Sequence, residues 1–588
     1  MTTYSAPVTD MQFVQHELSG LEEIASLPGF EEASPELVET VLEEAAKLAG
    51  EVLTPLNRVG DTEGARVEGD QVFLPDGFGE AYNELSDGGW LSLVHNPEFG
   101  GQGLPQLVSM AVEEMWNSAN LSLSLCPLLT KGAIEAIEAH AAGSLKDAYL
   151  PKLISGEWSA TMNLTEPQAG SDLAAVRTEA TPEGDHYRVR GQKIYITWGE
   201  HELTGNIIHL VLARLPDAPP GVGGISLFLV PKFLPNADGT PGERNDLKVV
   251  SIEHKLGIHA SPTCVMSFGE SEGAIGYLVG EENRGLACMF TMMNDARIGV
   301  GLQGLALCER AYQQAVTYAK DRVQGNLPGE RERVSIIKHA DVRRMLMLMK
   351  AQTEACRAVA YASASASDFF KHHEDEETRA RHRARWELLT PIVKGWCTEV
   401  SQEVTSLGIQ IHGGMGFVEE TGAAQYYRDA RITTIYEGTT GIQAGDLVGR
   451  KVMRDGGQAM QAMLAEINAV AEQGGFGWED ALTQSAGQLE EATRWLLTHG
   501  GDDLHAPGAA SFNFLMLAGT VVGGWQMARS AVAAQRRLDE GSDNEAFYQA
   551  KVATARFYAD HLLSRSSAYL AAATVGSAST MALADEQF

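Results

Sequence analysis

The sequence predicts a mainly α-helical protein with a central β-domain and additional helices at its C-terminal end. Two observations predict this class. Apolar residues recur at helical spacing over most of the chain, whereas residues 160–275 consist of short runs rich in β-branched residues, separated by Gly, Pro and Asp. Hydrophobic residues make up 44% and charged residues 21% of the 588 positions, which is typical of a globular chain and too apolar for disorder. A chain of this length is expected to hold about four domains.

The net charge is strongly negative. The chain has 45 Lys and Arg against 78 Asp and Glu, a formal charge of −33. Because nucleic acids and anionic membranes bind clustered Lys and Arg, we expect no general surface for either. The longest apolar stretch, residues 512–525, contains Asn513 and several glycines and predicts a buried helix rather than membrane insertion.

The cysteines and the N-terminal residues indicate the compartment. Six scattered cysteines form no CxxC pair, so neither a zinc ribbon nor a thioredoxin-type site is expected, and the spacing fits reduced, buried thiols. Residues 1–12 have neither the basic nor the apolar region of a secretory signal. We therefore expect a cytoplasmic protein.

The first half of the chain is expected to contain three segments. Residues 1–34 predict a polar N-terminal extension. Residues 35–159 predict an N-terminal helical domain, in which Pro35 begins a helix after the N-cap Ser34. The Gly- and Pro-rich residues 96–105 must form a loop within it. Residues 160–280 predict a middle β-domain of antiparallel strands.

The second half is expected to be helical. Residues 281–455 predict a helical bundle that carries the catalytic loop, and residues 456–588 predict an additional, Ala-rich helical domain. The expected elements of the bundle are one long helix over 286–322 in spite of interior glycines, helices near 334–371 and 376–408, a turn at 412–417, and a helix from about Ile442.

One candidate site is the loop LTEPQAGSD, residues 164–172, which leads into the first strands. Gly170, Ser171 and Asp172 allow close backbone approach, and Thr165 and Ser171 offer hydroxyl groups. Such a loop suits a phosphorylated cofactor, whose anionic groups need backbone N–H donors and small side chains. A turn in which Asp172 bonds its own backbone explains the same residues equally well.

A second candidate is KIYITWGE, residues 193–200, at a strand end. Thr197 can point its hydroxyl group into a cleft beside a large aromatic side chain. By itself this segment is only a strand, and the structural interpretation is favoured.

A third candidate is RITTIYEGTTGIQ, residues 431–443, in which Glu437 lies between Tyr436 and Gly438. A carboxylate in an apolar setting has a raised pKa and is a usable base near neutral pH. The alternative is a purely structural capping turn, because Thr439 and Thr440 can both cap the following helix.

Two arginines mark the long helix. Arg297 and Arg322 are 25 residues apart, which corresponds to about 37 Å along an unbroken helix. They cannot serve the same end of one ligand in one subunit. Either one is a plain surface residue or Arg322 reaches a ligand held by a neighbouring subunit.

Taken together and in this order, these segments resemble the acyl-CoA dehydrogenase family. The resemblance covers residues 35–455 and is strongest at LTEPQAGSD, IYITWG, HKLGIHASPTCVM, YAKDRVQG, QIHGGMGF and YRDARITTIYEGTTGIQ. It implies an N-terminal helical domain, a middle antiparallel β-barrel or sandwich and a C-terminal four-helix bundle around FAD. Residues 456–588 match the extra domain of long bacterial members, which include the 3-methylmercaptopropionyl-CoA dehydrogenases of dimethylsulfoniopropionate breakdown and broad-range fatty acyl-CoA dehydrogenases.

The resemblance implies α,β-dehydrogenation of an acyl-CoA thioester. Glu437 would remove the α-proton while the β-hydrogen leaves as hydride to flavin N5. The expected substrate is 3-methylmercaptopropionyl-CoA or a short- to medium-chain fatty acyl-CoA. The expected partners are an electron-transferring flavoprotein as acceptor and further copies of the chain, in a homodimer or a dimer of dimers. No metal is implied.

The resemblance also assigns residues to the ligands. The isoalloxazine and phosphate contacts match Met162, Leu164, Thr165, Ser171, Tyr195, Ile196 and Thr197. The contacts to the partner's FAD, to the adenosine and to the dinucleotide match Arg322, Gln324, Gln410, Gly413, Gly414 and Thr439. The substrate contacts match Ser171, Asn294 and Arg297.

Three positions depart from the family pattern. Tyr195 replaces a Trp, which leaves electron transfer to the usual flavoprotein open, and Asn294 replaces an Asp that contacts CoA. His259 replaces an Arg, and a lone His is expected to be structural. Two alternatives share the fold: an acyl-CoA oxidase that uses O₂, although its glycine loop differs from HGGMGF, and a DNA-binding flavoprotein, which would need a basic patch.

Overall fold

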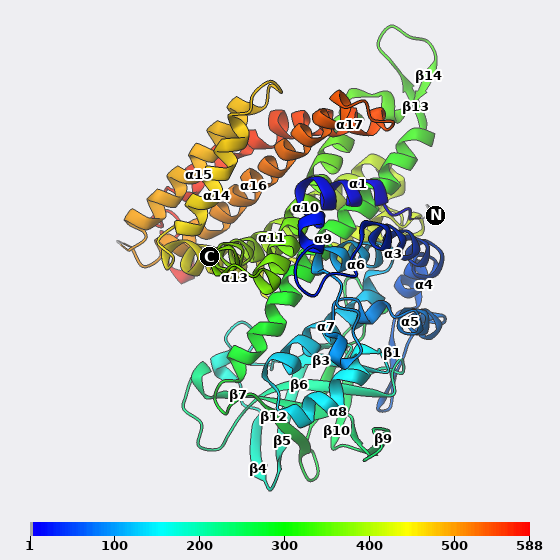
Figure 1. Cartoon of the computed structure of the whole chain (residues 1–588), viewed down its shortest axis with the longest axis vertical. Helices are drawn as coiled ribbons and strands as arrows, with labels where there is room; N and C mark the ends of the chain where they lie inside the picture. The colour runs from blue at the N-terminus through cyan, green and yellow to red at the C-terminus, as the bar shows by residue number, and fades with distance from the viewer. Residues whose placement is uncertain (1–3, 502) are drawn as a thin grey trace. The chain divides into compact units, whose positions relative to one another are not determined.

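The chain folds into two compact units (Figure 1). The computed structural model describes residues 4–501 and 503–588. The mixed unit consists of Lys47–Leu104 and Ala119–Ala296, and the helical unit consists of Met1–Ala46, Pro105–Ser118 and Arg297–Phe588. Helices at both ends of the chain with one central sheet confirm the predicted fold class.

The mixed unit is built around a sheet of eight strands in the order β10-β11-β5-β12-β7-β6-β3, with β4 paired beside β5. Its strands are β3 (Trp158–Asn163), β4 (Glu179–Glu183), β5 (His186–Thr197), β6 (Asn206–Arg214), β7 (Ile225–Pro231), β10 (Leu247–Ile252), β11 (Thr263–Phe268) and β12 (Ala274–Val279). The expectation of antiparallel strands throughout was wrong at one edge, because β3 runs parallel to β6. The chain passes through β4 and β5 before it returns beside β3, so no hairpin forces these two strands to be antiparallel.

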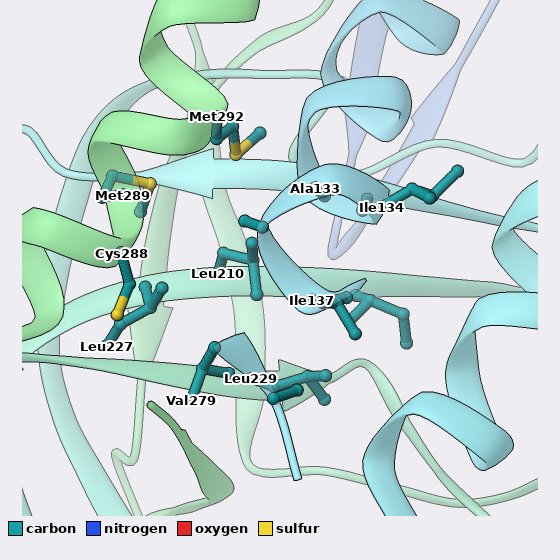
Figure 2. Packing of buried hydrophobic residues seen from close by; sticks show 14 of the residues in the cluster. Ala133, Ile134, Ile137, Leu210, Leu227, Leu229, Val279, Cys288, Met289 and Met292 are labelled. Carbon is teal, nitrogen blue, oxygen red and sulfur yellow. The ribbon is translucent and has the colours of Figure 1, made fainter. Parts of the chain in front are cut away.

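The core of this unit lies between the sheet and helix α7 (Leu121–His140). In Figure 2, Ala133 and Ile137 of α7 lie over Leu210 of β6 and Leu229 of β7, and Met292 of helix α9 closes one side. Every residue of β7, and all of β6 but its last, is buried, which is why IIHLVLA and ISLFLVP are continuous apolar runs without alternation.

Smaller elements complete the mixed unit. They are α4 (Thr54–Glu63), α5 (Phe78–Asp87), α8 (Gly143–Ile154) and the short hairpins β1 (Arg66–Glu68) with β2 (Gln71–Phe73) and β8 (Phe233–Pro235) with β9 (Pro241–Arg244). The β1–β2 hairpin, inside the segment expected to be helical, was not predicted. Its strands have three residues each, too few to show a period of two.

The helical unit contains long helices that follow the predicted order. They are α9 (Gly285–Asp321, whose first turns belong to the mixed unit), α10 (Ala340–His372), α11 (Glu376–His412), α12 (Ala423–Thr433) and α13 (Thr440–Asp446), with α3 (Pro35–Leu48) and α6 (Gln106–Ala119). The glycines of α9 are explained by close packing: a Cβ at Gly301 would lie 2.6 Å from the carbonyl oxygen of Val393, and one at Gly304 2.8 Å from that of Cys397. Ser34 accepts the N–H of Leu37 and caps α3 as predicted.

The predicted start of the second long helix at residue 334 was wrong. Residues Arg333–Ser335 form strand β14, which pairs with β13 (Val323–Asn326), and a 3₁₀ turn precedes α10. The apolar residues of this connection happen to continue the helical spacing, so periodicity alone extended the helix into it.

The C-terminal residues form five helices, α14 (Gln458–Ala471), α15 (Glu479–His499), α16 (Ala506–Asp539), α17 (Glu545–His561) and α18 (Ser566–Ala573). Trp396 of α11 packs so closely on α16 that a Cβ at Gly519 would lie 2.1 Å from its ring. Among the described residues, only α16 is long and apolar enough to cross a membrane, and 67% of its most apolar window is buried in the protein.

The N-terminal extension is not the polar leader that was expected. Its residues form α1 (Val8–Phe13), a π-helical turn (Val14–Leu18) and α2 (Leu21–Ala25), and Met11, Phe13, Leu18, Leu21 and Ile24 are buried. The π-helical turn interrupts the 3.6-residue period, which hides the apolar face from a periodicity search.

Candidate active site

Glu437 lies in a tight loop between α12 and α13. Its backbone is left-handed, with φ of +55°, although it is not a glycine. Such a conformation costs on the order of 1–3 kcal/mol and persists only where neighbouring contacts impose it. Here the side-chain Nε2 of Gln443 donates to the carbonyl oxygens of both Glu437 and Gly438, each at 3.2 Å.

Both ends of this loop are anchored. Thr439 accepts the N–H of Ile442 at 3.3 Å and caps α13, whereas Thr440, the other predicted cap, donates its hydroxyl to Glu399 at 2.6 Å. Tyr436 donates its hydroxyl to the side-chain oxygen of Gln303 on α9. The capping role foreseen for Thr439 is therefore real, and it fixes the backbone of Glu437.

The Glu437 carboxylate is held in a setting that favours its neutral form. The side chain is half-buried, and no hydrogen bond or ion pair reaches its carboxylate from the described residues. Burial raises its pKa to about 7, although the positive charges of Arg297 and Lys394 act in the opposite direction. A carboxylate with this pKa and no competing partner is suited to take up a proton near neutral pH.

Two cations lie in the electrostatic environment of this carboxylate. Arg297 of α9 is buried and forms an ion pair of 3.6 Å with Asp446 of α13. Lys394 of α11 is fully buried, and its Nζ has no hydrogen-bond partner among the described residues. Burial lowers the pKa of Lys394 to about 8, and the negative charge of Glu437 opposes that shift. Arg297 was a predicted site residue, whereas Lys394 was missed; its signal was a lone Lys in the apolar run TPIVKGW.

In the mixed unit, the loop after β3 is organised by Glu166. Its carboxylate accepts hydrogen bonds from the backbone N–H groups of Arg177 (2.8 Å) and Thr178 (3.0 Å) and forms an ion pair of 2.8 Å with Lys193. Burial opposes ionisation, but Lys193 and these donors hold the pKa of Glu166 down to about 2. Glu166 is thus a structural residue that sequence reasoning missed, because Arg177, Thr178 and Lys193 lie 11 to 27 residues away from it.

The predicted flavin residues of this unit are brought together. The N–H of Ile194 donates to the carbonyl oxygen of Thr165 at 2.9 Å, so the end of β3 lies beside the end of β5. Met162, Leu164, Thr165 and Thr197 are half-buried, and Gly170, Ser171 and Tyr195 are exposed. The side chain of Ile196 belongs to the apolar core, so only its backbone is available to a ligand.

Two structural roles that were expected from the sequence are also present, one for Asp172 and one for His259. Asp172 accepts the N–H of Ala174 at 3.1 Å, the self-capping turn that also explained the motif. His259 bonds the carbonyl oxygens of Asp61 (2.8 Å) and Lys255 (3.0 Å), so it has the structural role expected for it. Asn294 lies half-buried on α9.

The remaining predicted ligand residues form an exposed group in the helical unit. Arg322 follows the last residue of α9, and Gln324 lies in β13. Gln410 lies in the last turn of α11, and Gly413 and Gly414 follow it with open space where a Cβ would be. The length of α9 separates Arg322 from Arg297, so these residues do not belong to the Glu437 loop.

Comparison with known proteins defines the class of this enzyme. Three family models match in succession, described as the N-terminal domain (residues 37–157), middle domain (161–271) and C-terminal domain (283–453) of acyl-CoA dehydrogenase. A fourth, described as acetyl-CoA dehydrogenase C-terminal like, matches residues 462–584. The chain belongs to the acyl-CoA dehydrogenase family and is an oxidoreductase.

Full-length relatives place it among the long members. It is 50% identical to a 3-methylmercaptopropionyl-CoA dehydrogenase of Ruegeria pomeroyi over 96% of this chain and 97% of the relative. It is 34% identical to a butyryl-CoA dehydrogenase of Syntrophomonas wolfei over 100% of this chain and 99% of the relative. The fold is similar to that of a Bacillus anthracis acyl-CoA dehydrogenase solved with FAD, with a TM-score of 0.71, 22% identity and coverage of 93% and 89% of the two chains.

Proposed function

We propose that this enzyme is an FAD-dependent dehydrogenase of 3-methylmercaptopropionyl-CoA, with Glu437 as the catalytic base. The observation that carries the proposal is the Glu437 carboxylate itself, which is half-buried, has no bonded partner among the described residues, and has a pKa raised to about 7. The 50% identity to a 3-methylmercaptopropionyl-CoA dehydrogenase supports the substrate. Short linear acyl-CoA thioesters are the second substrate class, supported by the 34% identity to a butyryl-CoA dehydrogenase and by the similar size of a sulfur atom and a methylene group.

The residues of the chain fit FAD. Gly170 and Gly414 leave open space where a side chain would block a phosphate or a ring. The exposed Tyr195 has a left-handed backbone, with φ of +59°, so its aromatic ring stands at the surface beside Thr197 instead of in the core. Thr165, Ser171 and Thr197 would supply hydroxyl groups and backbone N–H donors. When bound, FAD supplies a two-electron acceptor for the β-hydrogen of the substrate, which leaves as hydride.

Glu437 performs the proton transfer. Its carboxylate oxygen takes the proton from Cα of the thioester, the Cα–H electron pair becomes the new double bond, and the hydride that leaves Cβ balances the charge. The α-proton is a weak acid, so the developing enolate oxygen needs a hydrogen-bond donor, for which the resemblance assigns the main-chain N–H of Glu437. The imposed left-handed backbone holds that N–H and the carboxylate in one fixed relation.

We further propose that the cytoplasmic enzyme works as a homodimer or a dimer of dimers and passes its electrons to an electron-transferring flavoprotein. Met415, Phe417 and Val418 are exposed apolar residues beside Gly413 and Gly414, with 87% of Phe417 accessible. Three exposed apolar side chains so close together in the sequence favour a protein interface. Arg322 and Gln324 would then contact FAD of a neighbouring subunit.

A rate profile over acyl-CoA thioesters with an artificial electron acceptor tests the function. We expect flavin absorbance in the purified protein and the highest kcat/KM for 3-methylmercaptopropionyl-CoA, with butyryl-CoA next. Absence of bound flavin together with absence of turnover would reject the proposal. Stoichiometric peroxide formation in air would instead assign the chain to the oxidases.

A further inference from the structure

A cavity of about 280 Å³ lies inside the helical unit, away from the Glu437 loop. Its walls come from α10, α11, α14 and α16 and from the π-helical turn of the N-terminal extension. Leu18, Leu389 and Val470 form an apolar part of the wall, whereas Arg385 and Arg529 bring two guanidinium groups to it. None of the residues assigned to FAD or to the acyl-CoA lines this cavity.

In the part of the chain that the structure describes, Arg529 has only neutral acceptors. Its Nη1 donates to the side-chain oxygen of Gln526 at 2.9 Å, and its Nη2 donates to the carbonyl oxygen of Leu18 at 2.7 Å. Its guanidinium also lies 5.3 Å from the centre of the Trp525 ring. Burial and the charge of Arg385 lower the pKa of Arg529 to about 10, so the group stays protonated at neutral pH. A guanidinium has five N–H donors, and three of those of Arg529 remain for a ligand.

The charges of the wall sum to one positive charge. Arg385 forms an ion pair with Glu466, which leaves Arg529 without a carboxylate partner among the described residues. His382 is neutral, because burial and the neighbouring arginines lower its pKa to about 4.

We propose that this cavity binds a small monocarboxylate with a short apolar chain. The carboxylate pairs with the guanidinium of Arg529, while the apolar chain lies against Leu18, Leu389 and Val470. One negative charge balances the wall, whereas a doubly charged phosphate would leave an excess beside Glu466. The cavity volume of about 280 Å³ is slightly below the usual range for small-molecule pockets, which suits a ligand as small as a short fatty acid. This inference is independent of the proposed function.

Calorimetric titration of the full-length holoenzyme with hexanoate tests the site, with saturating acyl-CoA present and the Glu437→Gln variant used to prevent turnover. We expect saturable binding of one hexanoate per chain, no binding of neutral hexanamide, and at least a tenfold weaker affinity in Arg529→Gln. Equal binding of hexanoate and hexanamide, binding of inorganic phosphate in preference to hexanoate, or no binding at all would overturn the proposal.

A matched pair of alanines protects the test against misfolding. Ala469 lines the cavity and is exposed at its mouth, whereas Ala465 on the same helix α14 is exposed but does not line it. Ala469→Leu is expected to abolish hexanoate binding, and Ala465→Leu is expected to leave it unchanged, with both variants as stable as the parent. Unchanged binding in Ala469→Leu would contradict the location.

Discussion

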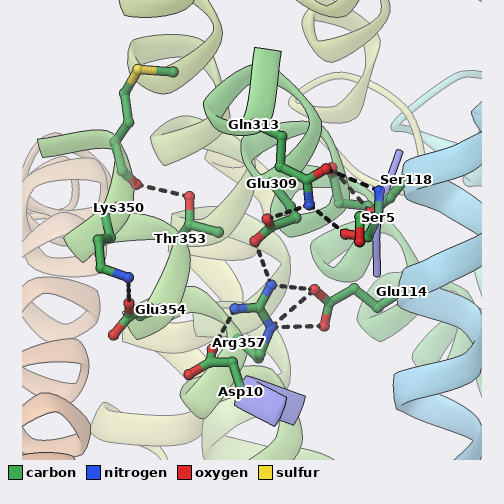
Figure 3. A network of polar contacts seen from close by, with 12 residues as sticks. Ser5, Asp10, Glu114, Ser118, Glu309, Gln313, Lys350, Thr353, Glu354 and Arg357 are labelled. Carbon is green, nitrogen blue, oxygen red and sulfur yellow. Dashed lines mark hydrogen bonds and ion pairs between the residues drawn. The ribbon is translucent and has the colours of Figure 1, made fainter. Parts of the chain in front are cut away.

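The helical unit contains a buried cluster of carboxylates that is fully hydrogen-bonded and one half-buried carboxylate, that of Glu437, that is not. In the cluster around Arg357 (Figure 3), the guanidinium donates to Asp10 at 2.6 Å, to Glu114 at 2.6 Å and to Glu309 at 2.7 Å. Tyr361 donates a further hydrogen bond of 2.8 Å to Glu114. The Glu437 carboxylate, on the same unit, receives none from the described residues.

The difference in hydrogen bonding does not by itself separate the pKa of Glu437 from that of Glu114. Burial raises the pKa of Glu114, as it does that of Glu437, and in both cases a cation opposes the shift. The two carboxylates differ in their hydrogen bonds: the oxygens of Glu114 accept from Arg357 and Tyr361, whereas those of Glu437 accept none from the described residues. A raised pKa alone therefore does not identify a base, and the proposal for Glu437 rests on the raised pKa together with the lack of partners among the described residues.

Removal of the unpartnered carboxylate is expected to have the largest effect on function. Glu437→Gln keeps the size of the side chain and removes the base, so kcat should fall by about 10²–10⁴-fold. Steady-state kinetics with an artificial acceptor measure this. Flavin content serves as the control and should be unchanged. Near-normal turnover in this variant would reject the role of Glu437.

Removal of the cation from the satisfied cluster is expected to have the largest effect on stability. Arg357→Met removes the cation from the buried carboxylates of Glu114 and Glu309, whereas Asp10 keeps its ion pair with Lys551, and the free energy of unfolding should fall by about 3–5 kcal/mol. Urea unfolding measures the change. Arg494→Met breaks an exposed pair with Glu490 and is the control, for which we expect less than about 1 kcal/mol. Equal effects in the two variants would show that the cluster does not stabilise the fold.

Removal of the Lys394 charge tests whether the surroundings of Glu437 set its pKa. Lys394→Met deletes a cation that stabilises the charged form of Glu437, so the pKa of Glu437 should rise. The pH–rate profile is expected to move to higher pH, with kcat/KM severalfold lower at pH 7 and nearly restored at pH 9. Lys394→Arg retains the charge and should retain the parent profile. A uniform loss at all pH values would indicate a structural role instead.

The smallest expected effect is a pH-dependent change in stability. The folded pKa of Glu437, about 7, is above the ordinary value of 4.5, so the folded state binds a proton more tightly than the unfolded state does. The stabilising contribution is full below pH 4.5 and is lost as pH rises through about 7. Glu437→Gln should therefore melt at a higher temperature than the parent at pH 8 and at a similar temperature at pH 5. A difference of the opposite sign would contradict the raised pKa.

The sequence by itself determined the order of helical and β segments and the identity of the key carboxylate. Periods of 3.6 and 2 report burial of nearby residues, so long helices such as α9 and α11 were predicted, and the YEGT motif singled out Glu437. Periodicity failed where the backbone leaves a regular period, at the π-helical turn near the N-terminus and at the three-residue strands.

Only the tertiary structure decided which polar groups meet. Lys394 acts on a carboxylate 43 positions away, Arg357 pairs with Asp10 across 347, and the cavity joins five separate elements. Local patterns carry no information about such distant pairs. Burial shifts the pKa of both Glu437 and Arg529, and burial depends on how the whole helical unit packs and not on any one segment of it.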